Sequence, residues 1–259
     1  MEILVTNDDG IQADGIRALA EALAPLGRIS IMAPDREQSA ASHALTLHRP
    51  LRVRKIAERV MSVDGTPTDS VLLGVHGFLK LKPDLVVSGI NHGPNMGSDV
   101  MYSGTVAAAS EGTFLGIPAI AVSLSAWGQS DFAPAAKVAH NLVRSLLDRG
   151  LPQRMCLNVN VPAIPFEQMR GLKITRLGKR IYRDVIVEKT DPRGKLYYWI
   201  GGEDPTWEHD ETSDFTAVEE GYVSVTPLSF ELTDYKGIVD LEALGLSIQD
   251  APASGARRP

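Results

Sequence analysis

The chain has 259 residues, of which 44% are hydrophobic and 22% are charged, and this composition is typical of an ordinary globular protein rather than a disordered chain. Twenty-six Lys and Arg stand against 32 Asp and Glu, a net charge of −6, which argues against a general DNA or RNA binder because such proteins need a basic surface to meet phosphates. The single cysteine, Cys156, excludes an internal disulfide and fits a reducing compartment.

No membrane segment or leader is predicted. The apolar runs are shorter than the ~18 residues that a membrane span needs. The chain opens on a strand-like segment at 2–5, with no basic stretch leading into an apolar one, so we expect no signal peptide. Cys156 lies in the strand-like segment 155–159 and is expected to be a small buried side chain. The sequence therefore predicts a cytoplasmic protein, with neither a membrane nor a nucleic-acid polymer as partner.

Strand and helix patterns alternate over the first two-thirds of the chain. Apolar strands are predicted at 3–5, 28–33, 84–88, 118–124 and 155–161. Helices are predicted at 16–23, 66–79, 105–115 and 133–147, the second of them with Thr66 as its N-cap. Strands that are apolar throughout and separated by helices form a parallel sheet covered on both faces. The sequence therefore predicts a doubly wound α/β fold, in which ligands bind at the carboxyl ends of the strands.

The pattern changes after about Arg170. Residues 181–202 alternate in strand fashion around the turn signal Asp191-Pro192-Arg193-Gly194. We expect a long hairpin that pairs 182–187 with 195–200. Its apolar face must be covered, either by a partner subunit or by the chain's own sheet, and the sequence leaves both open. Residues 250–259 are expected to form a loose tail.

Two adjacent carboxylates, Asp8 and Asp9, follow the first predicted strand. Two ionised carboxylates at a strand end repel each other, and a hard divalent metal with oxygen ligands removes that penalty. Neighbouring side chains on a strand point to opposite faces, so both reach one ion only if the chain turns, which Gly10 permits. A solvated Asp-Asp turn is the alternative that this motif leaves open.

The loops after the next two strands carry further polar side chains at the same predicted edge. The loop 34–43 offers Ser39 as a hydroxyl ligand and Arg36 as a phosphate clamp. The loop 88–99 combines glycines with polar residues, which is typical of close approach to a ligand. His43 and His92 lie in these loops, and we expect neither to be a proton donor.

The segment Ser103-Gly104-Thr105 lies where the third helix is predicted to begin. Free backbone N–H groups and the helix dipole at such a position suit a phosphate. Simple N-capping by Ser103 is the structural alternative, and the two roles can coexist.

Five segments together resemble, in order, the SurE family of stationary-phase survival proteins, which are metal-dependent 5'/3'-nucleotidases. They are Val5 to Ile11, Ala33-Pro34 with Gln38-Ser39, Ser88 to Asn91 with Gly93 to Gly97, Tyr102 to Val106, and Glu220 to Leu228. The resemblance runs to about Leu232. It implies a Rossmann-like core, an extended C-terminal hairpin used in subunit exchange, and a cytoplasmic homodimer or homotetramer. It also implies one domain over 1–249, with the core at about 1–178 and the hairpin extension at about 179–236, before the flexible tail.

The resemblance also implies the site. The metal ligands map onto Asp8, Asp9, Ser39 and Asn91, which would hold one Mg²⁺ or Mn²⁺ per subunit. The phosphate-binding groups map onto Asn95, Ser103, Gly104 and Thr105. The implied reaction is hydrolysis of nucleoside 5'-monophosphates, with 3'-monophosphates and short polyphosphate as further candidate substrates. Asp8 and Asp9 are the implied catalytic residues, and Asp9 is the candidate acceptor of the water's proton.

Two other classes share an acidic motif after the first strand. A haloacid-dehalogenase-like phosphatase needs an aspartate nucleophile where this chain has Asn7. A phospho-receiver module needs an aspartate at the end of the third strand and a later lysine, whereas this chain has Ser88-Gly89 there and no lysine in 120–126. Both classes therefore fit this sequence less well than the SurE family does. A non-catalytic nucleotide-binding protein remains a third alternative.

Overall fold

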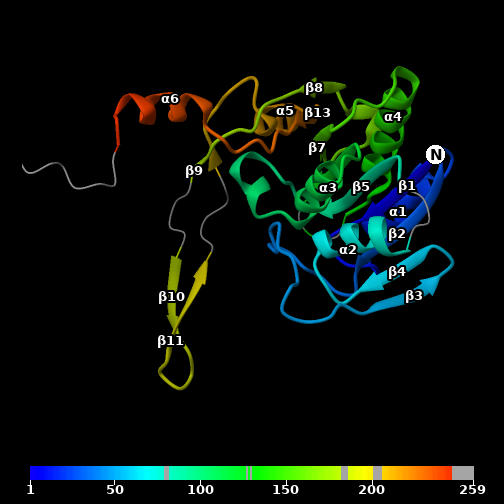
Figure 1. The fold of residues 1–259 in the computed structure, drawn as a ribbon, viewed down its shortest axis with the longest axis horizontal. Coiled ribbons are helices and arrows are strands. Elements are labelled where there is room, and N and C mark those ends of the chain that lie inside the picture. The colour runs from blue at the N-terminus through cyan, green and yellow to red at the C-terminus, as the bar shows by residue number, and fades with distance from the viewer. Residues whose placement is uncertain (79–81, 127, 129, 182–185, 201–205, 247–259) are drawn as a thin grey trace, which may run out of the picture. The chain divides into compact units, whose positions relative to one another are not determined.

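The computed structural model of the chain describes residues 1–78, 82–126, 128, 130–181, 186–200 and 206–246 (Figure 1). The chain divides into two compact units, Met1–Leu228 and Ser229–Pro259. The second unit contains one described helix, α6 (Tyr235–Ala243). The predicted tail at 250–259 lies outside the described residues, and the single domain over 1–249 stays a prediction.

A nine-stranded sheet forms the centre of the first unit. Its order is β3 (Val53–Ala57), β4 (Val60–Val63), β2 (Arg28–Pro34), β1 (Glu2–Thr6), β5 (Leu85–His92), β6 (Ala119–Ser125), β7 (Cys156–Pro162), β13 (Val223–Pro227) and β8 (Leu172–Ile174). The six strands from β4 to β7 in this order run parallel. The strands β3 and β13 run antiparallel to β4 and β7. The predicted mainly parallel sheet is confirmed, with edge strands that were not predicted.

Helices cover both faces of this sheet (Figure 1). On one side α1 (Asp14–Leu23) contacts α4 (Ala133–Arg149), and on the other α2 (Pro67–Leu73) contacts α3 (Gly104–Phe114). All four were predicted, and the predicted 66–79 helix is α2 continued by a π-helix at Gly74–Phe78. Two 3₁₀ turns (Gly97–Met101 and Phe166–Gln168) and α5 (Asp214–Glu219) complete the helical elements described in this unit.

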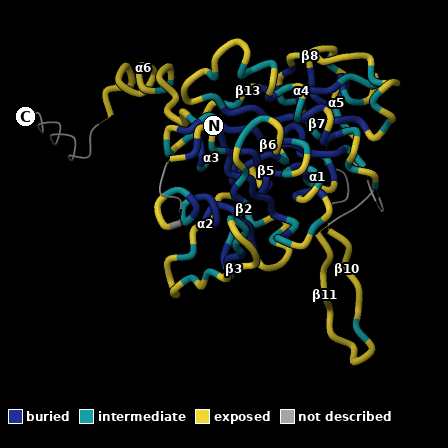
Figure 2. Tube along the Cα trace, turned by 90° about the vertical axis from the view of Figure 1, so that its right-hand side faces the viewer, coloured by how far each residue is buried: buried dark blue, intermediate teal, exposed yellow. Residues whose placement is uncertain are grey.

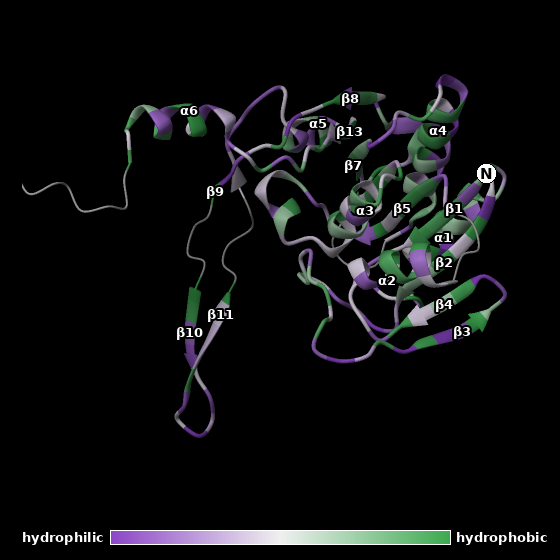
Figure 3. Ribbon diagram, in the orientation of Figure 1, coloured by the Kyte–Doolittle hydropathy of each residue, from purple (hydrophilic) through white to green (hydrophobic). Residues whose placement is uncertain are grey.

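The strands of the sheet alternate between its two faces. In β1, Ile3 and Val5 belong to the apolar core with Ile16 and Leu19 of α1. Leu4 faces the other side of the sheet, where it lies against Gly74 at the end of α2. Figure 2 shows the middle of the sheet as buried, and Figure 3 colours β5 mainly as hydrophobic. Burial on both faces is the reason that these strands read as continuous apolar runs in the sequence.

Thr66 begins α2 as predicted. Its hydroxyl accepts the N–H of Asp69 at 3.0 Å, and the Asp69 carboxylate accepts the N–H of Thr66 at 2.9 Å. This reciprocal capping box satisfies two N–H groups that the first turn of a helix leaves without partners. Pro67 at the first helical position lacks an N–H and so adds no unsatisfied donor.

The strand order creates a switch point beside β1. The chain leaves β1 for β2 on one side, whereas β5 lies on the other side and leads on to β6 and β7. Loops from neighbouring parallel strands that leave in opposite directions open a crevice at the carboxyl edge of the sheet. The crevice is therefore expected where β1, β2 and β5 end.

The predicted hairpin is confirmed. Its first strand ends at Thr190 and not, as predicted, at Val187. The strands β10 (Ile186–Thr190) and β11 (Leu196–Ile200) pair antiparallel, with Ile186 opposite Ile200. The turn between them is closed by Asp191, whose Oδ1 accepts the N–H groups of Arg193 at 2.8 Å and Lys195 at 2.9 Å. Residues 182–185, which were predicted to belong to the first strand, lie outside the described residues. A second short ladder joins β9 (Arg180–Ile181) to β12 (Thr206–Trp207).

Within the described part of the chain, no helix combines the length and apolarity that crossing a bilayer requires.

Candidate active site

The chain turns sharply after β1, as the acidic pair requires. Gly10 has φ of +97°, and a Cβ at this position would lie 2.9 Å from the carbonyl carbon of Arg36. The side chain of Asn7 donates from Nδ2 to the carbonyl oxygen of Gly10 at 2.9 Å, and Ile11 donates its N–H to the carbonyl oxygen of Pro34 at 2.8 Å. Only glycine fits both the dihedral angle and the space, so the predicted turn and its cause are confirmed.

Asp8 is the more deeply buried of the two carboxylates. Its side chain accepts a hydrogen bond from the Thr105 hydroxyl, and its main-chain oxygen accepts the N–H of Gln38 at 2.7 Å. The end of β1, the loop after β2 and the start of α3 thus meet at this residue. Burial raises the pKa of Asp8, and the bond from Thr105 offsets part of that rise. A cation beside this carboxylate would replace the solvation that it has lost.

Asp9 is less buried than Asp8 and lines a cavity. Burial first, and then the charge of Asp8, raise the pKa of Asp9 to about 6. The cavity has a volume of about 250 Å³ and is also lined by Asp14, His92 and Ser130. A carboxyl group with a pKa near neutrality inside a cavity is a candidate for acid–base chemistry.

The two remaining predicted ligands lie on the neighbouring strands. Asn91 ends β5, and its Nδ2 donates to the carbonyl oxygen of Gly93 at 2.8 Å. This bond uses the amide nitrogen and not the oxygen, the atom that a hard cation binds. Ser39 is exposed in the loop after β2, directly after the residue that contacts Asp8, and its hydroxyl donates to Glu37 Oε1 at 2.6 Å. Its oxygen lone pairs can still face a ligand.

The candidate ligands suit a hard divalent cation. No group of three or more His, Cys, Asp or Glu side chains in the described part of the chain could hold a metal. The predicted ligands are of another kind: two carboxylates after β1, of which Asp8 is buried, a hydroxyl in the loop after β2 and an amide oxygen near the end of β5. Oxygen donors without thiolate or imidazole are what Mg²⁺ and Mn²⁺ prefer.

The predicted phosphate loop lies against Asp8. Ser103 caps α3 by accepting the N–H of Val106 at 3.1 Å, so the N-capping role is confirmed. A Cβ on Gly104 would lie 2.7 Å from the Cβ of Asp8, so glycine lets the start of the helix touch the carboxylate. Thr105 is fully buried, and its hydroxyl donates a hydrogen bond to the Asp8 carboxylate. The backbone N–H groups of Gly104 and Thr105 also hydrogen-bond the Asp8 carboxylate and lower its pKa, so the positive end of the α3 dipole faces this carboxylate.

Asn95 is held by a network of buried side chains. Its Nδ2 donates to Ser123 Oγ at 2.8 Å, and its N–H donates to Asn160 Oδ1 at 2.8 Å. Its carbonyl oxygen accepts from the Nδ2 atoms of Asn158 at 2.8 Å and Asn160 at 2.9 Å. The carboxylate of Asp214 fixes the same loop by accepting the N–H of Gly97 at 2.8 Å.

Our reading of the sequence missed these positioning residues. Asn158 and Asn160 alternate with apolar residues in β7, so they share one face of a buried strand. Two amides on the inner face of a strand are costly unless they are paired, and this pattern could have indicated a buried polar network. Asp214 lies more than 100 residues from the loop that it holds, and no local signal indicates that contact.

Several other residues are excluded from the chemistry. Asn7 is buried and bonded to Gly10, so no nucleophile stands where a dehalogenase-like phosphatase needs one. His43 stacks on Phe114 with ring centroids 5.4 Å apart and bonds Glu111. Burial raises the pKa of Cys156 to about 12, so it stays a thiol, as expected of a small core residue.

The raised pKa of Asp9 leads to a pH-dependent stability. Because the folded-state pKa of about 6 lies above the value of 3.8 for an unperturbed aspartate, the folded chain binds more protons than the unfolded chain between these two pH values. The free energy of unfolding of the metal-free protein should therefore fall through this window as pH rises. Urea unfolding in excess chelator at pH 4.5, 5.5 and 7 should show Asp9→Asn gaining stability relative to the wild type, with a constant gain above pH 6. A difference that does not change with pH would contradict the raised pKa.

Comparisons with known proteins agree on one family. The family model described as "Survival protein SurE" matches residues 3–184. The chain is 55% identical over 248 residues to a protein named 5'-nucleotidase SurE from Geobacter sulfurreducens, covering 95% of both chains. It is 54% identical to the protein of that name from Myxococcus xanthus, covering 92% of this chain and 91% of the relative. The crystal structure of the SurE protein from Aquifex aeolicus superposes with a TM-score of 0.86 at 46% identity, covering 95% of this chain and 100% of that one.

Proposed function

The chain belongs to the SurE family, and from this membership and the site we propose that it is a metal-dependent phosphomonoesterase. It is an enzyme of the 5'-nucleotidase class, as its relatives are named. The proposed reaction is hydrolysis of a nucleoside 5'-monophosphate to the nucleoside and phosphate. The observation that carries the proposal is the contact of the buried Asp8 carboxylate with the start of α3, because a cation held by Asp8 would lie beside an anion bound at this helix terminus.

One divalent ion, Mg²⁺ or Mn²⁺, is proposed as the cofactor. Asp8, Asp9, Ser39 and Asn91 would hold it, since the first two follow β1, Ser39 follows β2 and Asn91 is the penultimate residue of β5. When bound, such an ion polarises a phosphoryl oxygen and lowers the pKa of water.

The chain's own residues orient the substrate and move the proton. We propose that the N–H groups of Gly104 and Thr105, which hydrogen-bond Asp8 in the structure, also stabilise the phosphoryl oxygens through the positive end of the helix dipole. Asn95, held by Asn158 and Asn160, lies on the loop that leads into this helix. We propose Asp9 as the acceptor of the proton of the attacking water.

The observed hydrogen bonds weaken the two rival classes. A phospho-aspartate route through the dehalogenase position would need a nucleophile at Asn7, which is instead an amide that closes the turn. In a receiver module, the end of the third predicted strand would carry an aspartate, whereas Ser88 and Gly89 occupy this part of β5. Only a measurement of turnover distinguishes the proposed enzyme from a non-catalytic nucleotide-binding protein.

The test of the proposal is a phosphate-release assay. The purified chain is incubated with nucleoside 5'- and 3'-monophosphates and with tripolyphosphate, each with Mg²⁺, with Mn²⁺ and with excess EDTA. We expect repeated turnover of 5'-monophosphates with a metal and none in chelator. Full activity in EDTA would contradict the metal role, and absence of turnover under every condition would leave only nucleotide binding.

We also propose that the hairpin of β10 and β11 is an oligomerisation arm in a homodimer or homotetramer. Its two strands pair with each other and leave seven large apolar side chains exposed, namely Ile186, Val187, Leu196, Tyr197, Tyr198, Trp199 and Ile200. Figure 2 shows both strands of the hairpin as exposed. Exposed apolar surface of this extent is typical of protein–protein contact.

Deletion of the hairpin should change the assembly. If residues 186–200 are replaced by a short Gly-Ser linker, the variant should run as a monomer or aggregate in light scattering, whereas the full chain should give a defined oligomer. The matched control replaces only the turn residues Asp191–Gly194 with Asn-Gly, which keeps the apolar strands and should keep the oligomer. An unchanged oligomer after the deletion would contradict the proposed role.

We assign the enzyme to the cytoplasm, because a chain with one buried cysteine needs no oxidising compartment.

A further inference from the structure

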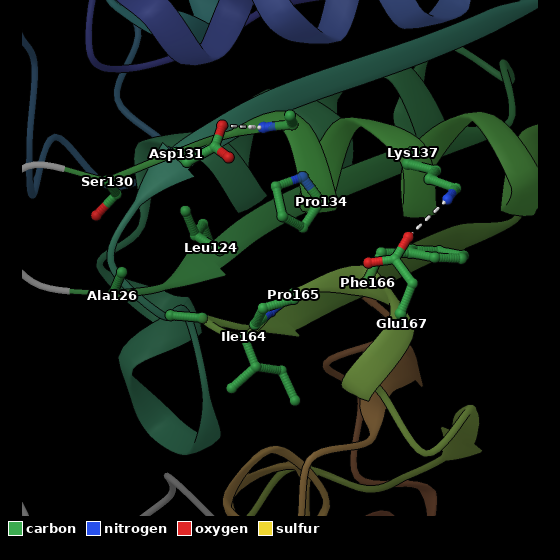
Figure 4. A pocket seen from close by; sticks show the side chains of 12 residues that line it. Leu124, Ala126, Ser130, Asp131, Pro134, Lys137, Ile164, Pro165, Phe166 and Glu167 are labelled. Carbon is green, nitrogen blue, oxygen red and sulfur yellow. Dashed lines mark hydrogen bonds and ion pairs between the residues drawn. The ribbon is translucent and has the colours of Figure 1, made fainter.

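The candidate active site has different boundaries on its two sides. Beside β6 and β7 lies a cavity of about 700 Å³, which Figure 4 shows with Ser130 at one end and Lys137 at the other. Ser130 also lines the smaller cavity that contains Asp9. Beside β2 the boundary is the loop that carries Ser39, most of whose residues are exposed. Ser39 can serve as a ligand only if this loop keeps its shape.

The backbone after Ser39 is strained. Ala40 has φ of +57° and Ser42 has φ of +52°. This left-handed region is costly for a residue that has a Cβ, and glycine and asparagine are the residues that usually occupy it. Strain of this kind persists only where the surrounding structure imposes it. The loop is therefore shaped by its contacts with the rest of the chain.

Main-chain bonds fix the segment on both sides of His43. Ser42 donates its N–H to the carbonyl oxygen of Tyr102 at 3.1 Å, directly before the N-cap of α3. The carbonyl oxygen of Ala44 accepts the hydroxyl of Thr66, the N-cap of α2, at 2.7 Å. The strained segment therefore contacts the starts of two helices, α2 and α3.

His43 adds a side-chain contact between these two bonds. Its ring stacks on Phe114 with the ring centroids 5.4 Å apart and an angle of 13° between the planes, and its Nε2 lies 2.8 Å from Glu111 Oε2. Both partners belong to α3, whose first turn hydrogen-bonds the Asp8 carboxylate. Because one helix contacts both Asp8 and the loop of Ser39, it sets the position of these two candidate ligands relative to each other.

We propose that His43 and Glu111 form a clamp that positions Ser39 for the divalent cation, an inference that rests on the proposed function. His43 is a positioning residue in this arrangement, because its Nε2 is bonded to Glu111 and its ring is stacked on Phe114. Partners of this kind, which orient a ligand without touching the metal, contribute strongly to metal affinity. Loss of the clamp should therefore weaken cation binding through Ser39.

The test measures the affinity for Mn²⁺ by calorimetry in single and combined variants. His43→Ala should weaken binding by roughly tenfold, and Glu111→Ala should weaken it to the same extent, because each removes the same contact. Glu111→Gln retains an oxygen that accepts the imidazole N–H and should keep most of the affinity. When Ser39 is already replaced by alanine, His43→Ala should cause no further loss, since the clamp acts through Ser39.

A second readout uses the metal-free protein. Chymotrypsin should cleave after Leu45 or Leu47, which are both exposed, several-fold faster in His43→Ala than in the wild type, because the loop opens locally more often. The control is His48→Ala. It removes an exposed imidazole from the same segment and should leave both the cleavage rate and the affinity for Mn²⁺ unchanged.

An unchanged affinity for Mn²⁺ in His43→Ala would overturn the inference. So would losses from Ser39→Ala and His43→Ala that multiply in the double variant, because His43 would then act independently of Ser39. Wild-type affinity in Ser39→Ala would also overturn it, since the clamp would have no ligand to position. Failure of the wild type to bind Mn²⁺ and to release phosphate from any nucleotide would instead refute the proposed function.

Discussion

Replacement of Asp8 by asparagine should reduce phosphate release by at least roughly a hundredfold, while the metal-free protein keeps its stability. The variant removes one of the two carboxylates that would hold the cation, so its affinity for Mn²⁺ in calorimetry should fall together with its turnover. Its stability should be preserved, because burial raises the pKa of Asp8 and an amide of the same shape carries no charge to desolvate. Thr105 can still donate its hydroxyl hydrogen to the amide oxygen.

The control for this variant is Asp148→Asn. Asp148 lies on the exposed C-terminal end of α4, so the same chemical change should leave turnover, metal affinity and unfolding unchanged. Near-wild-type turnover in Asp8→Asn would remove Asp8 from the site. A loss of activity with a matching loss of folded structure would instead assign it a structural role.

Thr105→Val should have the second largest effect, a loss of turnover of roughly a hundredfold, since removing one donor from an oxyanion site costs ~2.7–4 kcal/mol of barrier. The sequence predicted that this hydroxyl contacts the phosphate. In that case the affinity for metal should change little in the variant. In the structure the hydroxyl is bonded to Asp8, so the variant should also weaken metal binding. Calorimetric titration with Mn²⁺ beside steady-state kinetics separates the two routes.

Two matched variants complete this experiment. Thr105→Ser keeps the hydroxyl and should recover most of the turnover and metal affinity. Thr113→Val lies in the same helix, where the hydroxyl bonds to backbone carbonyl groups at 3.2 and 3.3 Å and to Cys156, and it should retain full activity. If Thr105→Val binds metal normally but turns over slowly, the hydroxyl acts on the phosphate. Normal values for both would limit Thr105 to starting the helix.

The central sheet and its helices could be predicted because their signals are local. Strands that are buried on both faces carry continuous apolar runs, as in residues 85–87 of β5 and residues 119–122 of β6, and helices bury one face at a period of 3.6 residues. Edge strands carry no such signal. In β3 four of five residues are exposed, so nothing in Val53–Ala57 distinguishes it from a loop.

In the hairpin, the local sequence pattern predicted the strands but not their register. The turn at Asp191 was predicted correctly because Pro and Gly fix its conformation, whereas the first strand runs to Thr190 and not, as predicted, to Val187. Period-two alternation gives a strand without its register, because a shift by two residues preserves the pattern. Only the observed pairing of Ile186 with Ile200 sets the register.

By itself the sequence determined the fold class, the turn at Gly10 and the acidic pair that it presents, because each follows from residues adjacent in the chain. Only the tertiary structure decided what surrounds that pair: the Thr105 hydroxyl on Asp8, the Asn158 and Asn160 amides on the Asn95 loop, and the cavity beyond Ser130. These hydrogen bonds join residues 63 to 97 positions apart, and the cavity brings separate strand ends together. Burial and hydrogen bonding are satisfied by whichever groups the fold brings within reach, and one sequence carries no local record of which distant group that is.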